Sequence, residues 1–376
     1  MDYIHHPLAL ANAVIELEAS PWLALDTEAD SLHHYVEKLC LMQISTQDKD
    51  FVIDPLVKLD LKPLVALMSR KPLILHGADF DLRILKKTFG FMPLEIFDTM
   101  IAAQFLGYDK QGLSDLARKH CAVELPKGAQ KADWSERPLD EKLLIYAGND
   151  THYLKTISDL MKDELTGLGR LPWHRQTCEK LIRTTQLSHD HKAGDDIAWQ
   201  VKGSKALSGA ALTILKELWI WREAEARRRD RPSFKIMNSE ILIDLARWSS
   251  ANPGMDAALM PKAPRHVRNE HRDTLNRILE EAKSKPQAQF TRKPFLSKSR
   301  SWTEASTQRL GAMKADREKL ALELKIHPSL LAANAVLETL ALAAPKNRQG
   351  LEVLGCLLPW QIDVMGESFL KIGNLI

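Results

Sequence analysis

The chain has 376 residues, of which 45% are hydrophobic and 27% charged, and its formal net charge is +3. This composition is typical of a folded globular protein and excludes a disordered or fibrous chain. At roughly 100–200 residues per domain we expect two or three domains, and the lack of any run of about 18 apolar residues predicts no membrane span.

The compartment is also constrained by the sequence. The segment 1–17 contains no Lys or Arg, which does not fit a secretory signal. The four cysteines are too far apart for a CxxC motif and give no disulfide framework. We therefore expect a cytoplasmic protein.

Charge is distributed unevenly along the chain. Residues 1–160 contain 17 Lys and Arg against 24 Asp and Glu, whereas residues 161–376 contain 35 against 25. Acidic groups attract cations and a basic surface attracts polyanions, so the asymmetry indicates two separate tasks. Two ordinary solvated surfaces remain an alternative on composition alone.

The first part of the chain alternates between strand and helix patterns. The predicted strands and helices, in chain order, are strands at 22–28, 39–46 and 51–53, a helix at 61–68, a strand at 72–76, and helices at 80–89, 100–105, 114–120 and 139–165. Asp98 and Thr99 are candidate caps for the helix at 100–105. This order predicts an α/β domain with a mixed sheet over residues 1–170.

The remainder of the chain is predicted to be all-helical. We expect one helical domain at 205–282, a basic linker at 283–304 and a second helical domain at 305–376. Residues 282–303 contain six Lys or Arg, two prolines and no acid, which is typical of a linker. Because a linker crosses few packed contacts, we expect the chain to remain folded without residues 283–376. The two helical blocks could be distant copies of one module.

Three groups of residues in the first domain can carry chemistry. Asp26 and Glu28 are two apart on a strand and share a face, where two carboxylates raise each other's pKa unless a cation neutralises them. Asp81 lies in the first turn of the helix after the fourth predicted strand. Tyr146 and Asp150, at i and i+4, share one face of a late helix. Taken singly, each group has an ordinary structural explanation.

Together these groups resemble the DEDD superfamily of 3′→5′ exonucleases, in the branch that has Tyr four residues before the last acid. Four stretches are similar to the ribonuclease D family: 38–44, 97–103, 131–139 and 146–154. Residues 215–232 resemble the helical HRDC domain, and residues 310–376 resemble a second, divergent one.

The resemblance implies a ribonuclease-H-like fold and two divalent ions, Mg²⁺ or Mn²⁺, at a cluster of oxygen ligands. It implies that Asp26 bridges both ions, that Glu28 and Asp150 complete one site, and that Asp81 holds the other, partly through water. Because a free phenol titrates near about pH 10, Tyr146 is expected to orient the attacking water by a hydrogen bond and not to act as a base.

Contacts to the substrate are weaker predictions. Lys127, Lys131 and Arg137 lie in the loop before the tyrosine helix, and the resemblance makes them candidates for phosphate contacts; solvated surface residues are the alternative. His76 ends a strand and is a candidate for substrate or metal contact, with a structural histidine as the alternative. Trp134 is expected to pack the loop.

The function implied by the resemblance is a metal-dependent 3′→5′ exoribonuclease that releases nucleoside 5′-monophosphates. Its expected partner is RNA with a free 3′ end, such as a tRNA precursor, with no membrane and no obligate protein partner. Two alternatives stay open at this point: a 3′→5′ exodeoxyribonuclease with the same site, and a catalytically inactive scaffold that binds nucleic acid.

Overall fold

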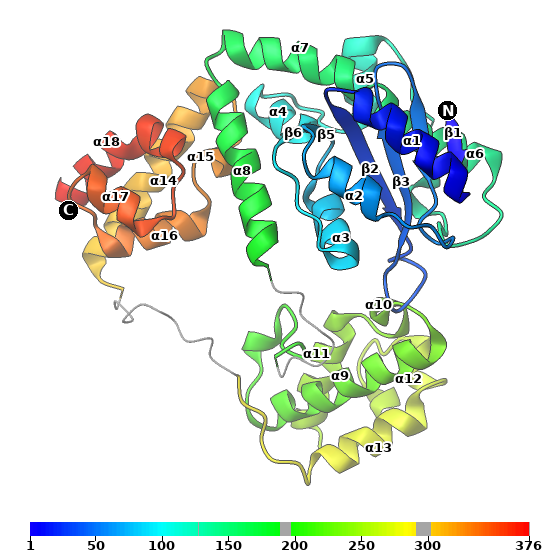
Figure 1. The fold of residues 1–376 in the computed structure, drawn as a ribbon. Helices are drawn as coiled ribbons and strands as arrows, with labels where there is room; N and C mark the ends of the chain where they lie inside the picture. The colour runs from blue at the N-terminus through cyan, green and yellow to red at the C-terminus, as the bar shows by residue number, and fades with distance from the viewer. Residues whose placement is uncertain (127, 189–196, 291–301, 376) are drawn as a thin grey trace. The chain divides into compact units, whose positions relative to one another are not determined.

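The computed structural model describes residues 1–126, 128–188, 197–290 and 302–375, and the chain divides into two compact units (Figure 1). The first unit comprises Met1–Ala29, Leu39–Ser188 and Ser297–Ile376, and the second comprises Asp30–Lys38 and His189–Leu296. Within the described ranges, no helix combines the length and the apolarity needed to cross a membrane.

The first unit is built on a six-stranded mixed sheet of order β1-β4-β3-β2-β5-β6. Its strands are β1 (Asp2–Ile4), β2 (Leu23–Ala29), β3 (Leu39–Ser45), β4 (Asp50–Ile53), β5 (Leu73–Leu75) and β6 (Ile96–Asp98). The central strand β2 pairs antiparallel with β3 and parallel with β5, which confirms the predicted α/β fold with a mixed sheet. The sequence did not predict β1, because three residues are too short to show an alternating pattern.

Helices cover both faces of this sheet. The helices on one face are α1 (Pro7–Ala19), α2 (Lys62–Met68), α3 (Asp79–Phe89) and α8 (Leu171–Leu187), which pack with Leu25, Met42 and Ile44. On the other face α6 (Glu141–His152) packs with Leu41 and Val52. Because side chains alternate along a strand, Asp26 and Glu28 lie on the α6 face of β2, and Thr27 lies on the α3 face.

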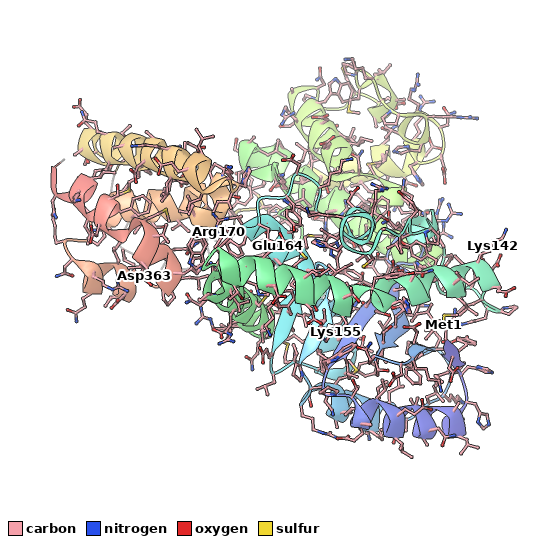
Figure 2. The ribbon with its side chains drawn as sticks, turned by 90° about the horizontal axis from the view of Figure 1, so that it is seen from above. Met1, Lys142, Lys155, Glu164, Arg170 and Asp363 are labelled. Atoms are coloured by element: carbon pink, nitrogen blue, oxygen red, sulfur yellow. The ribbon has the colours of Figure 1, made fainter. Side chains whose placement is uncertain are left out.

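The predicted single helix at 139–165 is wrong at one point, because the structure has two helices there. The first, α6, ends at His152, and α7 (Leu154–Gly167) begins one residue after Tyr153. Figure 2 follows the pair from Lys142 through Lys155 to Glu164. Neither Pro nor Gly marks the break in the sequence, which is why the helical pattern reads as continuous. The break lets α6 pack on β3 and β4 while α7 packs with a second core.

The C-terminal helices share this second core with the sheet-containing part of the first unit. These helices are α14 (Glu304–Leu324), α15 (Pro328–Leu331), α16 (Asn334–Ala343), α17 (Arg348–Leu354) and α18 (Pro359–Leu375). Met313 and Trp360 from them pack in one cluster with Phe105 and Met161, from α4 (Thr99–Phe105) and α7. The expectation that residues 283–376 can be removed without crossing packed contacts is therefore wrong.

Polar contacts reinforce that junction. The buried Arg170 guanidinium donates to the carbonyl of Phe105 at 2.6 Å and to the carbonyl of Leu324 at 2.8 Å. Gly107 has a φ of +71°, and a Cβ built on it would lie 2.1 Å from the Lys325 carbonyl oxygen. A glycine is required there by both its backbone conformation and the close approach of the C-terminal helices.

The second unit is an all-helical module with its own apolar core. Its α-helices are α9 (Gly209–Arg229), α10 (Ser233–Ile236), α11 (Ser239–Ala251), α12 (Arg265–Arg268) and α13 (Arg272–Ala282). Buried Arg222 on α9 donates to the Met237 carbonyl, and buried Arg317 on α14 donates to the Ala332 carbonyl; each acceptor lies 15 residues after its arginine. This shared arrangement supports the interpretation that the two helical blocks are copies of one module.

Candidate active site

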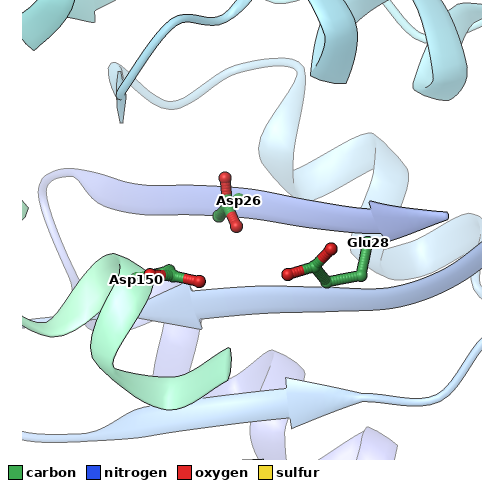
Figure 3. Close-up of side chains that lie close together, drawn as sticks. All are labelled: Asp26, Glu28 and Asp150. Carbon is green, nitrogen blue, oxygen red and sulfur yellow. The ribbon is translucent and has the colours of Figure 1, made fainter. Parts of the chain in front are cut away.

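Three carboxylates meet on the α6 face of the sheet. One oxygen from each of Asp26, Glu28 and Asp150 lies within 4.8 Å of the others. Figure 3 shows these three side chains on their strand and helix. Asp26 and Glu28 come from alternate positions of one strand, and Asp150 comes from the helix that covers that strand. Several carboxylate oxygens at this spacing form a hard, oxygen-only ligand set, which fits Mg²⁺ or Mn²⁺.

Burial and the negative charges of neighbouring acids raise the pKa values of the carboxyl groups in this cluster. Desolvation, followed by the charges of Asp150 and Asp81, raises the pKa of Glu28 to about 9. Desolvation raises the pKa of Asp150 to about 7. The pKa of Asp26 is also raised, first by burial and then by its acidic neighbours. A bound cation would reverse this penalty by compensating several negative charges at once.

Asp81 lies close to this cluster but is held separately. It is buried in the first turn of α3, and the Thr27 hydroxyl donates to one of its carboxylate oxygens at 2.5 Å. Burial raises the pKa of Asp81 to about 6, and the bond from Thr27 opposes that shift. The charge of Asp81 also raises the pKa of Asp26, and it is the largest contribution from any charged neighbour of Asp26.

Asp98 supports the site from the end of β6, a role that the sequence did not reveal. It caps α4 as predicted, since its carboxylate accepts hydrogen bonds from the backbone N–H groups of Met100 and Ile101. The same carboxylate also accepts from the N–H groups of Gly77 and Ala78, at 3.0 and 2.8 Å. The Asp98 carboxylate therefore fixes the turn that precedes α3, the helix that carries Asp81.

Tyr146 is arranged as a hydrogen-bond donor. Burial, followed by the charges of Asp150 and Glu28, raises its pKa far above its ordinary value, so the phenol stays protonated. A protonated phenol has a proton to donate to an acceptor, and the side chain of Gln130 lines the same cavity. Trp134 is buried beneath, with its ring centroid 6.1 Å from that of Tyr146, which confirms its predicted packing role.

A cavity of about 620 Å³ opens in front of these groups. Its lining includes Asp26, Glu28, Tyr146 and Asp150 together with His76, Met100, Leu113 and Gln130. The volume is of the size that accommodates one small ligand, and its wall combines carboxylates with apolar side chains.

The structure places His76 in the wall of this cavity. Its Nδ1 lies 2.9 Å from the Thr99 hydroxyl oxygen, which also lies 3.1 Å from the Leu75 carbonyl oxygen; when the hydroxyl donates to that carbonyl, its oxygen accepts from Nδ1–H of His76. Desolvation lowers the pKa of His76, although the charge of Asp98 opposes it. The neutral ring then carries its lone pair on Nε2, which has no hydrogen-bond partner among the described residues.

The three residues predicted to contact phosphate, Lys127, Lys131 and Arg137, differ in their surroundings. Arg137 forms an ion pair with buried Asp54, with Nε–Oδ2 at 2.6 Å, and its guanidinium also donates to the carbonyls of Trp134 and Cys40. This geometry favours an anchor for the loop over a phosphate contact. Lys131 is exposed at the end of the short helix η1 (Ala129–Lys131). Lys127 lies outside the described residues.

Comparison with known proteins follows the same division of the chain. A family model described as a 3′-5′ exonuclease matches residues 1–166, and an HRDC domain model matches residues 211–254 and 306–372. The chain is 31% identical to a ribonuclease D of Xanthomonas oryzae over 349 residues, which are 90% of this chain and 91% of that protein. It is 36% identical to a ribonuclease D of Zymomonas mobilis over 251 residues, and the match spans 64% of this chain but only 63% of that protein.

A solved structure resembles the whole chain. The crystal structure of Escherichia coli RNase D, described as an exoribonuclease involved in structured RNA processing, matches with a TM-score of 0.71. The match covers 100% of this chain and 98% of that one at 24% sequence identity, which establishes a shared fold.

Proposed function

Because this chain belongs to the ribonuclease D family, we propose that it is a metal-dependent 3′→5′ exoribonuclease that removes nucleotides one at a time from a free 3′ end. The observation that carries the proposal is the convergence of Asp26, Glu28 and Asp150 within 4.8 Å in the wall of a cavity large enough for a nucleotide. The products would be nucleoside 5′-monophosphates.

Each side chain of the site has a role that follows from its chemistry. We propose that Asp26, Glu28, Asp81 and Asp150 hold two divalent cations, Mg²⁺ or Mn²⁺. Such cations supply the positive charge that stabilises the attacking and leaving oxygens of an in-line displacement at phosphorus. Tyr146 remains protonated and donates a hydrogen bond that orients the attacking water, while Glu28 accepts from the other side of that water.

His76 is proposed as the group that contacts the terminal sugar. Its Nε2 lone pair is an acceptor in the cavity wall, and a ribose 2′-hydroxyl is a donor that deoxyribose lacks. This arrangement favours RNA over DNA as the substrate. The natural substrate that fits the family best is a structured RNA with a short single-stranded 3′ tail, such as a tRNA precursor. The four free thiols fit a reducing compartment such as the cytoplasm.

The decisive experiment is digestion of a tailed RNA hairpin and its DNA equivalent, each labelled near the 5′ end, in EDTA and in increasing Mn²⁺. We expect stepwise shortening of the RNA from its 3′ end only when Mn²⁺ is present. Asp26→Asn should abolish shortening while leaving RNA binding in EDTA largely intact, and Asp48→Asn, in an exposed turn, is the matched control. Faster shortening of the DNA would support the exodeoxyribonuclease, and binding without shortening would support the inactive scaffold.

A further inference from the structure

Gln43 is a buried polar residue to which the mechanism above assigns no task. It lies in the middle of β3, its side chain is 0% exposed, and the strand is buried along its whole length. Neither its amide nitrogen nor its amide oxygen has a hydrogen-bond partner in the described part of the chain. Buried polar groups in native proteins are nearly always paired, so an amide with both ends unpaired calls for an explanation.

The sheet register places Gln43 directly beside the carboxylate cluster. Asp26 on β2 and Gln43 on β3 are opposite each other in the antiparallel ladder. Directly opposite residues point to the same face with Cβ atoms about 4.5–5.5 Å apart, which is within reach of a glutamine side chain. Gln43 is therefore next to Asp26, one of the residues that we propose would hold the cations.

The helix that carries Asp150 covers the same position. Ser45, two residues after Gln43 and on the same face, has its hydroxyl 2.7 Å from that of Thr151 on α6. Thr151 follows Asp150 directly in that helix, so Gln43 lies in the layer between the strand and the helix that supply the metal ligands. The Gln43 side chain is buried, and Asp26 is the polar residue directly opposite it in the described ladder.

We propose that Gln43 is a positioning residue of the metal site, whose amide N–H donates to the carboxylate of Asp26 when that carboxylate is ionised and bound to cations. The inference rests on the proposed function. Thr27 already provides such a donor to Asp81 from the other face of β2, at 2.5 Å, and Gln43 provides the corresponding donor on the α6 face. A carboxylate that binds a cation through one oxygen leaves a lone pair that a donor of this kind orients.

A role in filling the core does not account for this residue. A buried amide without partners destabilises the folded chain, and an apolar side chain of similar size would fill the same space without that cost. A glutamine is useful here only if its partner becomes available in another state of the site. The metal-bound state, with its ionised carboxylates, is that state.

The test measures the thermal unfolding of the full chain in EDTA and in increasing Mn²⁺, for the wild type and for Gln43→Met. Methionine keeps the length of the side chain and removes both polar atoms. We expect Gln43→Met to unfold in EDTA at a temperature equal to or above that of the wild type, and to need about tenfold more Mn²⁺ for half of the metal-dependent stabilisation.

Ser45→Ala is the matched control on the same strand and face, because its hydroxyl already has partners in Thr151 and Asp50. It should lower the unfolding temperature in EDTA and leave the Mn²⁺ requirement unchanged. Should Gln43→Met fold poorly, Gln43→Leu serves as the second variant. An unchanged Mn²⁺ requirement in the variant that folds overturns the inference. If Mn²⁺ fails to stabilise even the wild type, the proposed metal-dependent function itself is wrong.

Discussion

The hydroxyl of Thr27 donates to the carboxylate of Asp81 at 2.5 Å, and this bond joins β2 to α3, two of the three elements that supply the acids of the site. Thr27 lies between Asp26 and Glu28 on β2, with its side chain on the opposite face, whereas Asp81 belongs to α3. A hydrogen bond to an ionised carboxylate stabilises the charged form, so Thr27 favours the ionised form of Asp81, which its proposed role as a ligand requires, despite its burial.

Replacing Thr27 by Val tests this relationship. Without the hydroxyl, the pKa of Asp81 should rise further above its present value of about 6. The acidic limb of the rate–pH profile should shift to higher pH, and at neutral pH the Mn²⁺ requirement should rise about tenfold. The control is Thr166→Val on α7, whose hydroxyl bonds only the Lys162 carbonyl on an exposed surface. Superimposable pH profiles for wild type and Thr27→Val would refute the role.

The local part of the site could be predicted from the sequence. The strand with Asp26 and Glu28 and the helix with Tyr146 and Asp150 each show a short pattern of spacing that needs no knowledge of the rest of the chain. The relationship between Asp26 and Gln43 could not be predicted, because it depends on the register of β2 against β3. A shift of one residue would have turned Gln43 to the other face.

Contacts between residues far apart in the chain explain why the sequence-based predictions for Arg137 and Asp98 were incomplete. Arg137 was a candidate phosphate contact because it is a cation in a loop, but its partner is Asp54, which lies 83 residues earlier in the chain and is buried. The second task of Asp98, holding the turn before α3, joins residues about twenty positions apart. Sequence patterns report helix periodicity and caps, and they carry no information on such pairings.

The raised carboxylate pKa values predict how the metal-free protein responds to pH. The pKa of Glu28 is about 9 and that of Asp150 about 7 in the folded state, against ordinary values of 4.5 and 3.8. The folded state thus binds more protons than the unfolded state between about pH 4 and pH 9, and stability falls as the pH rises through that range. Thermal unfolding in EDTA should show this fall, and saturating Mn²⁺ should flatten it.

Glu28→Gln provides the control for that measurement. Glutamine cannot titrate, so the variant should lose the slope between about pH 7 and pH 9, where only Glu28 contributes. Between about pH 4.5 and pH 7 it should keep about half of the slope, which comes from Asp150. Equal slopes in EDTA and in Mn²⁺ for the wild type would contradict the assignment of these carboxylates as cation ligands.

Removal of the C-terminal helices should unfold the first unit. Deleting residues 283–376 removes Met313 and Trp360 from the core that they share with Phe105. We expect a poorly soluble product with a lowered unfolding temperature, in contrast to the expectation from the linker-like sequence. Arg170→Ala leaves the buried carbonyl of Phe105 and the partly buried carbonyl of Leu324 without this donor. It should destabilise the intact chain by about 2–3 kcal/mol.

The control for Arg170 is Arg247→Ala, because Arg247 is exposed on α11 and pairs only with exposed Asp244. Its effect on the free energy of unfolding should stay within about 0.5 kcal/mol. A truncated chain that unfolds cooperatively at the temperature of the full-length protein would show that α14–α18 are dispensable for the first unit.

His76 should decide how well the site distinguishes ribose from deoxyribose at the 3′ end. Its neutral Nε2 is an acceptor in the cavity wall, held in that tautomer by Thr99, and the 2′-hydroxyl is the donor that only RNA offers. One hydrogen bond is worth up to about 1.5 kcal/mol, and about 1.4 kcal/mol corresponds to a tenfold rate ratio. The measurement compares two RNA oligomers that differ only in whether the last nucleotide carries a 2′-hydroxyl.

The wild type should cleave the ribose end up to about tenfold faster, and His76→Ala should bring the ratio close to one by slowing that substrate alone. Tyr146→Phe is the control, since loss of the phenolic hydroxyl should slow both substrates equally. If His76→Ala instead slows both substrates equally and raises the Mn²⁺ requirement, His76 is a metal ligand and the sugar contact is wrong.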